Sequence, residues 1–277
     1  MQKLEPKQFV LDSEIVVPEG TSLSFDLLLQ RIHPAASRIR KLSEETPAEL
    51  VVFDLLVDDA GKPLHESSLA LRRTALEGFA ARYFKNIKAI HLSPATGSFK
   101  EAQAWLADLH GGLDGIIAKR TDLGYQSGNR EGMLKIKSLR SADCVVGGFR
   151  YASKGNLVGS LLLGLYDNEG KLHHVGFTSG LSAAEKPELT RKLEALREPP
   201  GFTGQAPGGP SRWSTERSTV WEPLANTLVV EVQYDHFAGG RFRHGTRVVR
   251  WRPDKAPSQC TLAQVERDSL SPLSLLA

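Results

Sequence analysis

The stretch Gly111–Leu139, GGLDGIIAKRTDLGYQSGNREGMLKIKSL, constrains this chain more than any other. It contains two short apolar segments that each end on basic residues, joined by a polar loop with three glycines. The first segment, Ile116–Ala118, is rich in β-branched residues and predicts a strand that ends at Lys119. The second segment, MLKIK, alternates, and this alternation places Lys135 and Lys137 on one face of a second strand.

The lysines of this stretch predict an anion site. Two ammonium groups held ~7 Å apart on one strand face repel each other by roughly 2 kcal/mol at an effective dielectric of 20. An anion beside Lys135 and Lys137 removes that cost, and with Lys119 nearby the simplest such ligand is a phosphate. The alternative is that these lysines occupy the solvent-exposed face of a sheet. That alternative fits an isolated K-x-K, but it explains less of the ordered series D-G-I-I-A-K-R, glycine-bearing loop and L-K-I-K.

Composition limits the class of protein. The chain has 277 residues, 40% of them hydrophobic and 24% charged, which allows two ordinary domains or one large domain around a real core. A net charge of +3 is compatible with a polyanionic partner without demonstrating one. Cys144 and Cys260 lie far apart in no C-x-x-C arrangement, so neither a disulfide framework nor a zinc site is indicated. The polar N-terminus and the lack of a long apolar run predict a cytoplasmic protein with no membrane partner.

The two basic segments resemble motifs IV and V of the ATP-dependent DNA ligases, which have the form E-G-hydrophobic-hydrophobic-x-K and K-x-K. This resemblance implies that Lys119, Lys135 and Lys137 bind a nucleotide. Asp114 stands where motif IV usually has glutamate, which makes it the candidate metal ligand. The aspartate keeps the charge and shortens the reach by one methylene.

Two upstream segments extend the resemblance. FVLDSEIVV predicts a strand with Asp12 and Glu14 on one face, and it is similar to motif III, D-G-E, with Ser13 in place of the glycine. Paired carboxylates there can bind a metal or the hydroxyls of a sugar; the alternative is an ordinary strand with one polar side. LVVFDLLV is similar to motif IIIa, whose phenylalanine, here Phe53, stacks on adenine; the alternative is a core phenylalanine. The lone Asp54 in this apolar strand is costly unless it has a partner.

The coarse secondary structure changes near residue 141. Before that point the sequence predicts helices over 22–42 with a break at His33-Pro34, over 68–84, and over 98–109 with a capping box of Ser98 and Glu101. After it, the sequence predicts strands over 144–151, 157–166, 173–178, 227–237 and 247–251, with a helix over 182–197 that Ser182 and Glu185 cap. Five short strands with one helix are typical of a Greek-key barrel such as the OB-fold. The expected fold is therefore α+β: a partial nucleotidyltransferase domain, ATP-grasp-like, over 1–140, followed by an OB-fold β-barrel domain over 141–277.

The C-terminal segment is rich in arginine. Arg252-Pro253-Asp254-Lys255 matches ligase motif VI, R-x-D-K, and the resemblance implies that Arg252 and Lys255 orient the leaving pyrophosphate. We expect Arg241, Arg243 and Arg247 to bind the phosphates of DNA. The alternative, a generally basic barrel, also points to nucleic acid.

One family element is missing from the sequence. Ligases carry motif I, K-x-D-G, some tens of residues before motif III, and its lysine takes AMP. Here Lys3 and Lys7 are the only upstream lysines, and neither precedes D-G. The resemblance therefore implies a monomeric ATP-dependent DNA ligase that acts on nicked duplex DNA with ATP and Mg²⁺ or Mn²⁺, lacking the N-terminal part with motif I. The alternatives are a non-catalytic nucleic-acid-binding remnant or accessory subunit, and an RNA ligase or capping nucleotidyltransferase.

Overall fold

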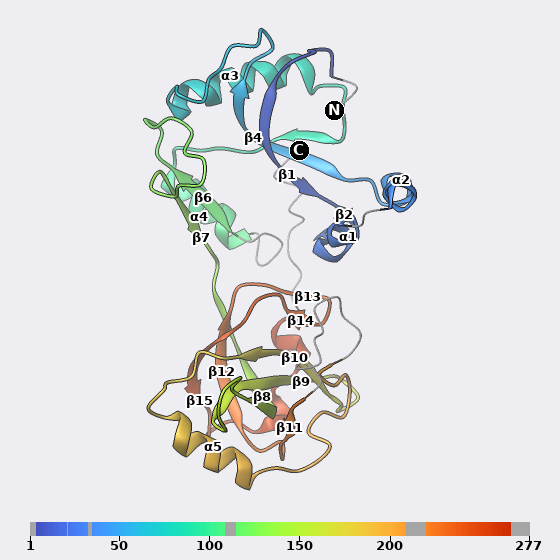
Figure 1. The fold of residues 1–277 in the computed structure, drawn as a ribbon, viewed down its shortest axis with the longest axis vertical. Coiled ribbons are helices and arrows are strands. Elements are labelled where there is room, and N and C mark those ends of the chain that lie inside the picture. Colours follow the sequence, from blue (N-terminus) through green and yellow to red (C-terminus); the bar gives the residue numbers. More distant parts are fainter. Residues whose placement is uncertain (1–3, 21, 33–34, 109–114, 209–219, 267–277) are drawn as a thin grey trace. The chain divides into compact units, whose positions relative to one another are not determined.

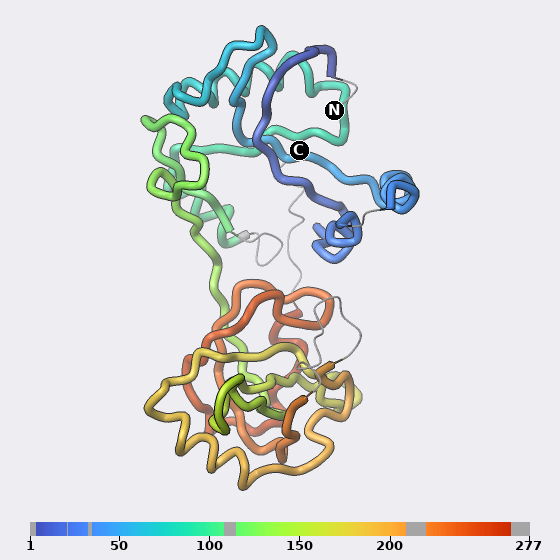
Figure 2. Tube along the Cα trace, in the orientation of Figure 1, coloured from blue at the N-terminus to red at the C-terminus, as the bar shows by residue number. Residues whose placement is uncertain are grey.

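A computed structural model describes residues 4–20, 22–32, 35–108, 115–208 and 220–266. The chain divides into two compact units: unit 1 includes Met1–Lys137, and unit 2 is Ser138–Asp268. Figure 2 follows the chain directly from the last hairpin of unit 1 into the first long strand of unit 2. No helix of the described ranges is long and apolar enough to cross a membrane.

Unit 1 is built on a three-stranded sheet with the strand order β1-β4-β5 (Figure 1). Its strands are β1 (Val10–Val16), β4 (Glu49–Val57) and β5 (Ile90–Leu92). β1 is antiparallel to β4, whereas β5 is parallel to it. Helix α3 (Leu69–Tyr83) contacts β4. The buried side chains of β4 and α3 form the core of the unit, chiefly Val52, Leu55, Leu76 and Phe79.

The pairing of β1 with β4 is interrupted beside Phe53. Asp12 pairs with Asp54 and Ser13 pairs with Val52, so Phe53 has no direct partner in β1. Such an extra residue bends a strand and redirects a side chain. The irregularity therefore lies at the residue that the motif comparison assigned to adenine stacking.

The shorter elements of unit 1 follow the predicted order, with different helix bounds. They are β2 (Pro18–Glu19), β3 (Ser22–Leu23), α1 (Phe25–Leu29), α2 (Ala36–Glu45), α4 (Phe99–Asp108), β6 (Ile116–Lys119) and β7 (Met133–Ile136). The helix predicted over 22–42 is two helices, and the His33-Pro34 break lies outside the described residues. At α4, Ser98 Oγ accepts from the backbone N–H of Glu101, but the Glu101 carboxylate accepts from Thr96 and so does not close the predicted capping box.

Unit 2 is built on a six-stranded sheet. The main path is β10-β9-β8-β12-β15, and β11 also pairs with β8. The bounds are β8 (Arg140–Tyr151), β9 (Val158–Tyr166), β10 (Leu172–Thr178), β11 (Glu222–Pro223), β12 (Val229–Tyr234) and β15 (Arg247–Trp251). Two short strands, β13 (Phe237–Ala238) and β14 (Arg241–Phe242), form a separate pair. A single bridge between Thr178 and Thr246 links the end of β10 to the residue before β15. Within the described ranges the main pairings form an open path, and isolated bridges also join Tyr166 to Thr261 and Arg197 to Leu224.

The core of unit 2 is larger than that of unit 1. It includes Phe149, several leucines of β9, and both cysteines, Cys144 and Cys260, which are buried free thiols. Helix α5 (Lys186–Ala195) packs on it, and the Thr190 hydroxyl accepts the backbone N–H of Val158. The capping box predicted at Ser182 is wrong, because α5 begins at Lys186 with no side-chain cap. Two 3-10 turns, Pro257–Gln259 and Leu262–Gln264, follow β15.

Candidate nucleotide and phosphate sites

The β6–β7 hairpin carries the lysines that the sequence singled out (Figure 1). Ile117 pairs with Lys135 and Lys119 pairs with Met133. Directly paired residues of an antiparallel sheet point to the same face, so Lys119 and Lys135 share one face of the hairpin. Lys137 follows the end of β7, and its alternation with Lys135 continues this face. Both Lys135 and Lys137 are exposed.

A glycine closes the base of the hairpin. Gly115 has a φ of +130°, and a Cβ on it would lie 2.1 Å from the carbonyl oxygen of Ile136. Any other residue would therefore clash with the backbone just before Lys137. The glycine of the D-G pair in motif IV is therefore required sterically, a requirement that sequence reasoning did not show.

Lys119 reaches the central sheet of unit 1. Its ammonium nitrogen lies 4.8 Å from the centroid of the Phe53 ring. An ammonium at this distance over an aromatic face is attracted by the ring quadrupole. The structure therefore brings together one lysine of the hairpin and the phenylalanine of β4, which are distant in sequence.

The loop between β6 and β7 is anchored by two residues that sequence reasoning missed. The Tyr125 hydroxyl donates to Asp12 Oδ2 at 2.7 Å. The same hydrogen bond raises the pKa of Tyr125 to about 12. Arg72 lies 5.8 Å from the centroid of the Tyr125 ring and donates to the carbonyl oxygen of Leu123. The loop is thus tied to β1 on one side and to α3 on the other.

Arg72 is also the partner that Asp54 requires. Arg72 Nε donates to Asp54 Oδ1 at 2.8 Å and Nη2 donates to Oδ2 at 2.9 Å, with both side chains almost wholly buried. Such bidentate pairing compensates the cost of burying the two charges. The unpartnered aspartate in an apolar strand was the signal that a buried cation had to exist, although nothing in the sequence identified Arg72 as that cation.

The structure gives less information on the two acidic candidate residues, Glu14 and Asp114. Glu14 is exposed and pairs in the β1–β4 register with Val51. Asp114, the candidate metal ligand, lies outside the described residues. Within the described ranges, no three His, Cys, Asp or Glu side chains are placed to hold a metal ion.

In unit 2, Arg252 and Lys255 meet at one carboxylate. Arg252 Nη1 donates to Asp143 Oδ1 at 2.8 Å, and Lys255 Nζ donates to Asp143 Oδ2 at 2.7 Å. Arg252 Nε and Nη2 are turned to Asp254. The hydrogen bond from Arg252 lowers the pKa of Asp254 to about 2, and the same contact raises the pKa of Arg252. Asp143, which no motif had singled out, is therefore the shared partner of both candidate phosphate ligands.

The three arginines predicted to bind DNA are spread over the β14–β15 segment. Arg241 begins β14 and Arg247 begins β15, and both are exposed. Arg243 follows β14 and is half-buried. A role for them in binding DNA stays a prediction.

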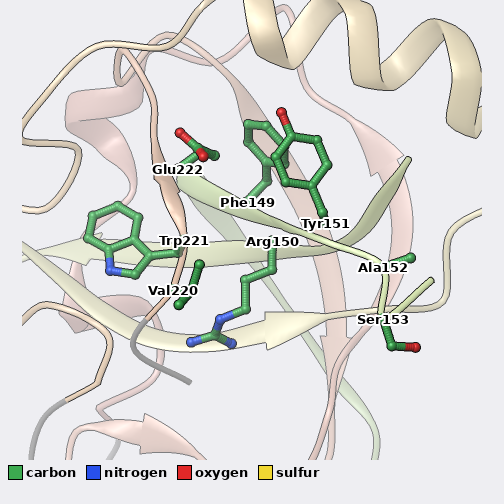
Figure 3. A pocket seen from close by; sticks show the side chains of 8 residues that line it. All are labelled: Phe149, Arg150, Tyr151, Ala152, Ser153, Val220, Trp221 and Glu222. Carbon is green, nitrogen blue, oxygen red and sulfur yellow. The ribbon is translucent and has the colours of Figure 1, made fainter. Parts of the chain in front are cut away.

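Unit 2 also contains an open pocket of about 280 Å³ at the ends of β8 and β11 (Figure 3). Its walls include the aromatic rings of Phe149, Tyr151 and Trp221, with the side chain of Arg150 among them (Figure 3). None of the residues proposed for nucleotide or DNA binding lines it.

Comparison with known proteins identifies the family. Residues 1–137 match the model of the ATP dependent DNA ligase domain, and residues 154–255 match that of the ATP dependent DNA ligase C terminal region. DNA ligase C2 of Mycolicibacterium smegmatis is 41% identical over 281 residues, covering 94% of this chain and 77% of that protein. This chain belongs to the ATP-dependent DNA ligase family.

One further relative agrees with this assignment, and one solved structure shares the fold. DNA ligase C of Mycobacterium tuberculosis is 40% identical to this ligase, with 95% of this chain and 77% of that protein covered. The solved structure of Pmar-Lig_PreS3 has a TM-score of 0.57 at 17% identity, covering 88% of this ligase and 51% of that chain. This structural likeness shows the fold alone. The family resemblance inferred from motifs III to VI is confirmed, as is the assignment as a DNA ligase (ATP).

Proposed function

We propose that this ligase binds ATP in unit 1, with basic side chains at its phosphates. Phe53 stacks on the adenine, Glu14 binds a ribose hydroxyl, and Lys119, Lys135 and Lys137 bind the phosphates. Arg252 and Lys255 orient the pyrophosphate. The observation that carries this proposal is the 4.8 Å approach of the Lys119 ammonium to the Phe53 ring, which joins the two motifs at one place.

The rest of the functional assignment follows the family. Unit 1 serves as the adenylation domain and unit 2 as an OB-fold domain, and the bridge between Thr178 and Thr246 supports a barrel in unit 2. Arg241, Arg243 and Arg247 bind the backbone of nicked duplex DNA, and the ligase acts as a monomer. Mg²⁺ or Mn²⁺ supports the reaction, with Asp114 as the candidate ligand.

The 277 residues contain no K-x-D-G, and this affects the individual steps of ligation. In the first step of the family reaction a lysine takes AMP from ATP, and in the second it passes AMP to the 5′-phosphate of the nick. In the third step the 3′-hydroxyl attacks the adenylylated 5′-phosphate, forming the phosphodiester bond and releasing AMP. The polypeptide of this sequence is proposed to lack the first step and to retain the third, which depends on positioning and charge stabilisation.

Labelled ATP tests the first part. Purified protein incubated with labelled ATP and magnesium is expected to give no covalent adduct on a denaturing gel. A stable adduct on any lysine of this sequence would overturn that part.

A nick supplied in pre-adenylylated form tests the second part. Slow sealing is expected, and it should fall at least tenfold in Lys119→Ala, because one positioned charge at a reacting phosphate is worth about 1.4 kcal/mol or more. Equal sealing by the Lys119→Ala variant would remove Lys119 from the site.

The absence of K-x-D-G favours one alternative, a non-catalytic nucleic-acid-binding subunit. The two functions differ in one measurement. A binding subunit retains the pre-adenylylated nick without joining it, whereas the ligase joins it and releases AMP.

A further inference from the structure

Asp143 stands between the two candidate phosphate ligands of unit 2. Its side chain is 11% exposed, and those of Arg252 and Lys255 are 18% and 22% exposed. One of its oxygens, Oδ2, accepts from both Arg252 Nη1 and Lys255 Nζ. A carboxylate oxygen shared by two cations occupies the position that a phosphate oxygen would take between them.

The surrounding charges balance. On the neighbouring strands, Asp143 pairs with Glu231 and Glu231 pairs with Arg250. Glu231 forms an ion pair with Arg250, and Asp254 forms one with Arg252. Three cations therefore face three carboxylates. An anion that approaches Arg252 and Lys255 meets no net positive charge as long as Asp143 stays in place.

The backbone of Asp143 is held in place, whereas its carboxylate contacts side chains of the β15 end. The backbone N–H of Asp143 donates to Gln264 Oε1 at 3.1 Å, and Gln264 Nε2 donates to the Asp143 carbonyl oxygen at 3.1 Å. Asp143 also belongs to β8, in the middle of the sheet. Lys255 lies after the end of β15, in the turn that precedes a 3-10 segment. An incoming phosphate therefore competes with the Asp143 carboxylate alone, while the backbone of Asp143 stays in the sheet.

We propose that Asp143 is an internal substitute for phosphate: it holds Arg252 and Lys255 in place, and polyphosphate binds them only by displacing its carboxylate. Asp143 is thus a positioning residue that also lowers the affinity of unit 2 for phosphate. This inference rests on the proposed role of Arg252 and Lys255 as phosphate ligands.

The test measures binding of inorganic pyrophosphate to the full chain by titration calorimetry at low salt. Asp143→Asn keeps the shape and one acceptor oxygen and removes the charge. Its affinity for pyrophosphate is expected to rise at least tenfold, because the variant removes the negative charge that competes with pyrophosphate for both cations. A purely structural role would lower the thermal midpoint without strengthening pyrophosphate binding.

Glu169→Gln is the matched control. It removes the same charge from the same unit. Glu169 forms an exposed ion pair with Lys171 in the turn between β9 and β10. Its affinity for pyrophosphate should equal that of the wild type. The double variant Asp143→Asn with Lys255→Met should lose the gain, which locates the binding at this cluster.

A second variant keeps the proposal testable if the asparagine protein does not fold. Gln264→Ala leaves every charge in place and removes two hydrogen bonds to the Asp143 backbone, so a smaller gain of about threefold is expected, because the carboxylate is then held less firmly against the two cations. An unchanged or weaker affinity in the folded variants overturns the role of Asp143. A gain that persists without Lys255 also overturns it. Failure of every variant to bind pyrophosphate overturns both this inference and the assignment of Arg252 and Lys255, whereas sealing of the pre-adenylylated nick is scored separately and tests the proposed reaction.

Discussion

At the scale of single residues, Phe53 combines an irregular backbone with a cation over its ring. Phe53→Leu removes the aromatic face and keeps an apolar side chain, so we expect ATP affinity to fall about tenfold, since stacking on a base is worth about 1–3 kcal/mol. Equilibrium binding of labelled ATP measures this. Phe99→Leu is the control, because Phe99 is 78% exposed on α4. Equal losses in the two variants would contradict a specific role for Phe53.

His174 is the residue that should make stability depend on pH. Burial, aided by Arg150 and Arg241, lowers the pKa of His174 to about 4, and its ring packs edge-on against Phe202. The unfolded chain takes up this proton near pH 6.5, whereas the folded chain resists protonation down to about pH 4. Stability contributed by neutral His174 is therefore complete above pH 6.5. It is lost as the pH falls toward 4, by at most about 3 kcal/mol.

Urea unfolding of unit 2 at pH 7.5, 6 and 4.5 measures this loss. In His174→Gln the decrease between pH 6.5 and 4 should be smaller than in the wild type. His173→Gln is the matched control. His173 is adjacent in sequence, but its ring lies 2.7 Å from Asp167 instead of packing against Phe202. The interpretation fails if the wild type and His174→Gln show the same pH profile.

At the scale of secondary-structure elements, the Asp54–Arg72 pair joins β4, α3 and the β6–β7 loop. Arg72→Met would leave Asp54 buried without its cation, which costs about 3–5 kcal/mol of unit 1 stability. The same change removes the donor to Leu123, so the loop should become more sensitive to proteases. Urea unfolding and limited proteolysis measure the two effects.

The neighbouring Arg73 supplies the control for Arg72. Arg73 pairs with Glu77 at 2.8 Å one turn along the same helix, where Glu77 is largely exposed. Arg73→Met should cost less than about 1 kcal/mol. Similar losses for the two arginines would show that burial of the Asp54 pair contributes little.

At the scale of the whole molecule, DNA affinity should depend on salt through the arginines of the β14–β15 segment. Replacing Arg241, Arg243 and Arg247 together with Gln should reduce the log–log salt slope by up to about 2.7, because each neutralised phosphate contributes about 0.9. Binding of the full chain to a nicked duplex at several salt concentrations gives the slope. The control replaces Lys154, Lys171 and Arg191, which are exposed elsewhere on the same unit. A slope that changes equally in both triple variants would contradict a localised DNA site.

The sequence by itself determined the longer strands, the order of the motifs and the family of this ligase, because these depend on alternation and spacing along the chain. Only the tertiary structure decided which distant side chains meet: Lys119 at Phe53, Arg72 at Asp54, and Asp143 at Arg252 and Lys255. The beginning of α5 also escaped the sequence, since Ser182 had the cap pattern and α5 nonetheless begins at Lys186. The physical reason is the separation along the chain over which each feature is set. Strand alternation depends on neighbouring residues, whereas the partner of a charge can be any residue that folding brings within a few ångströms of it.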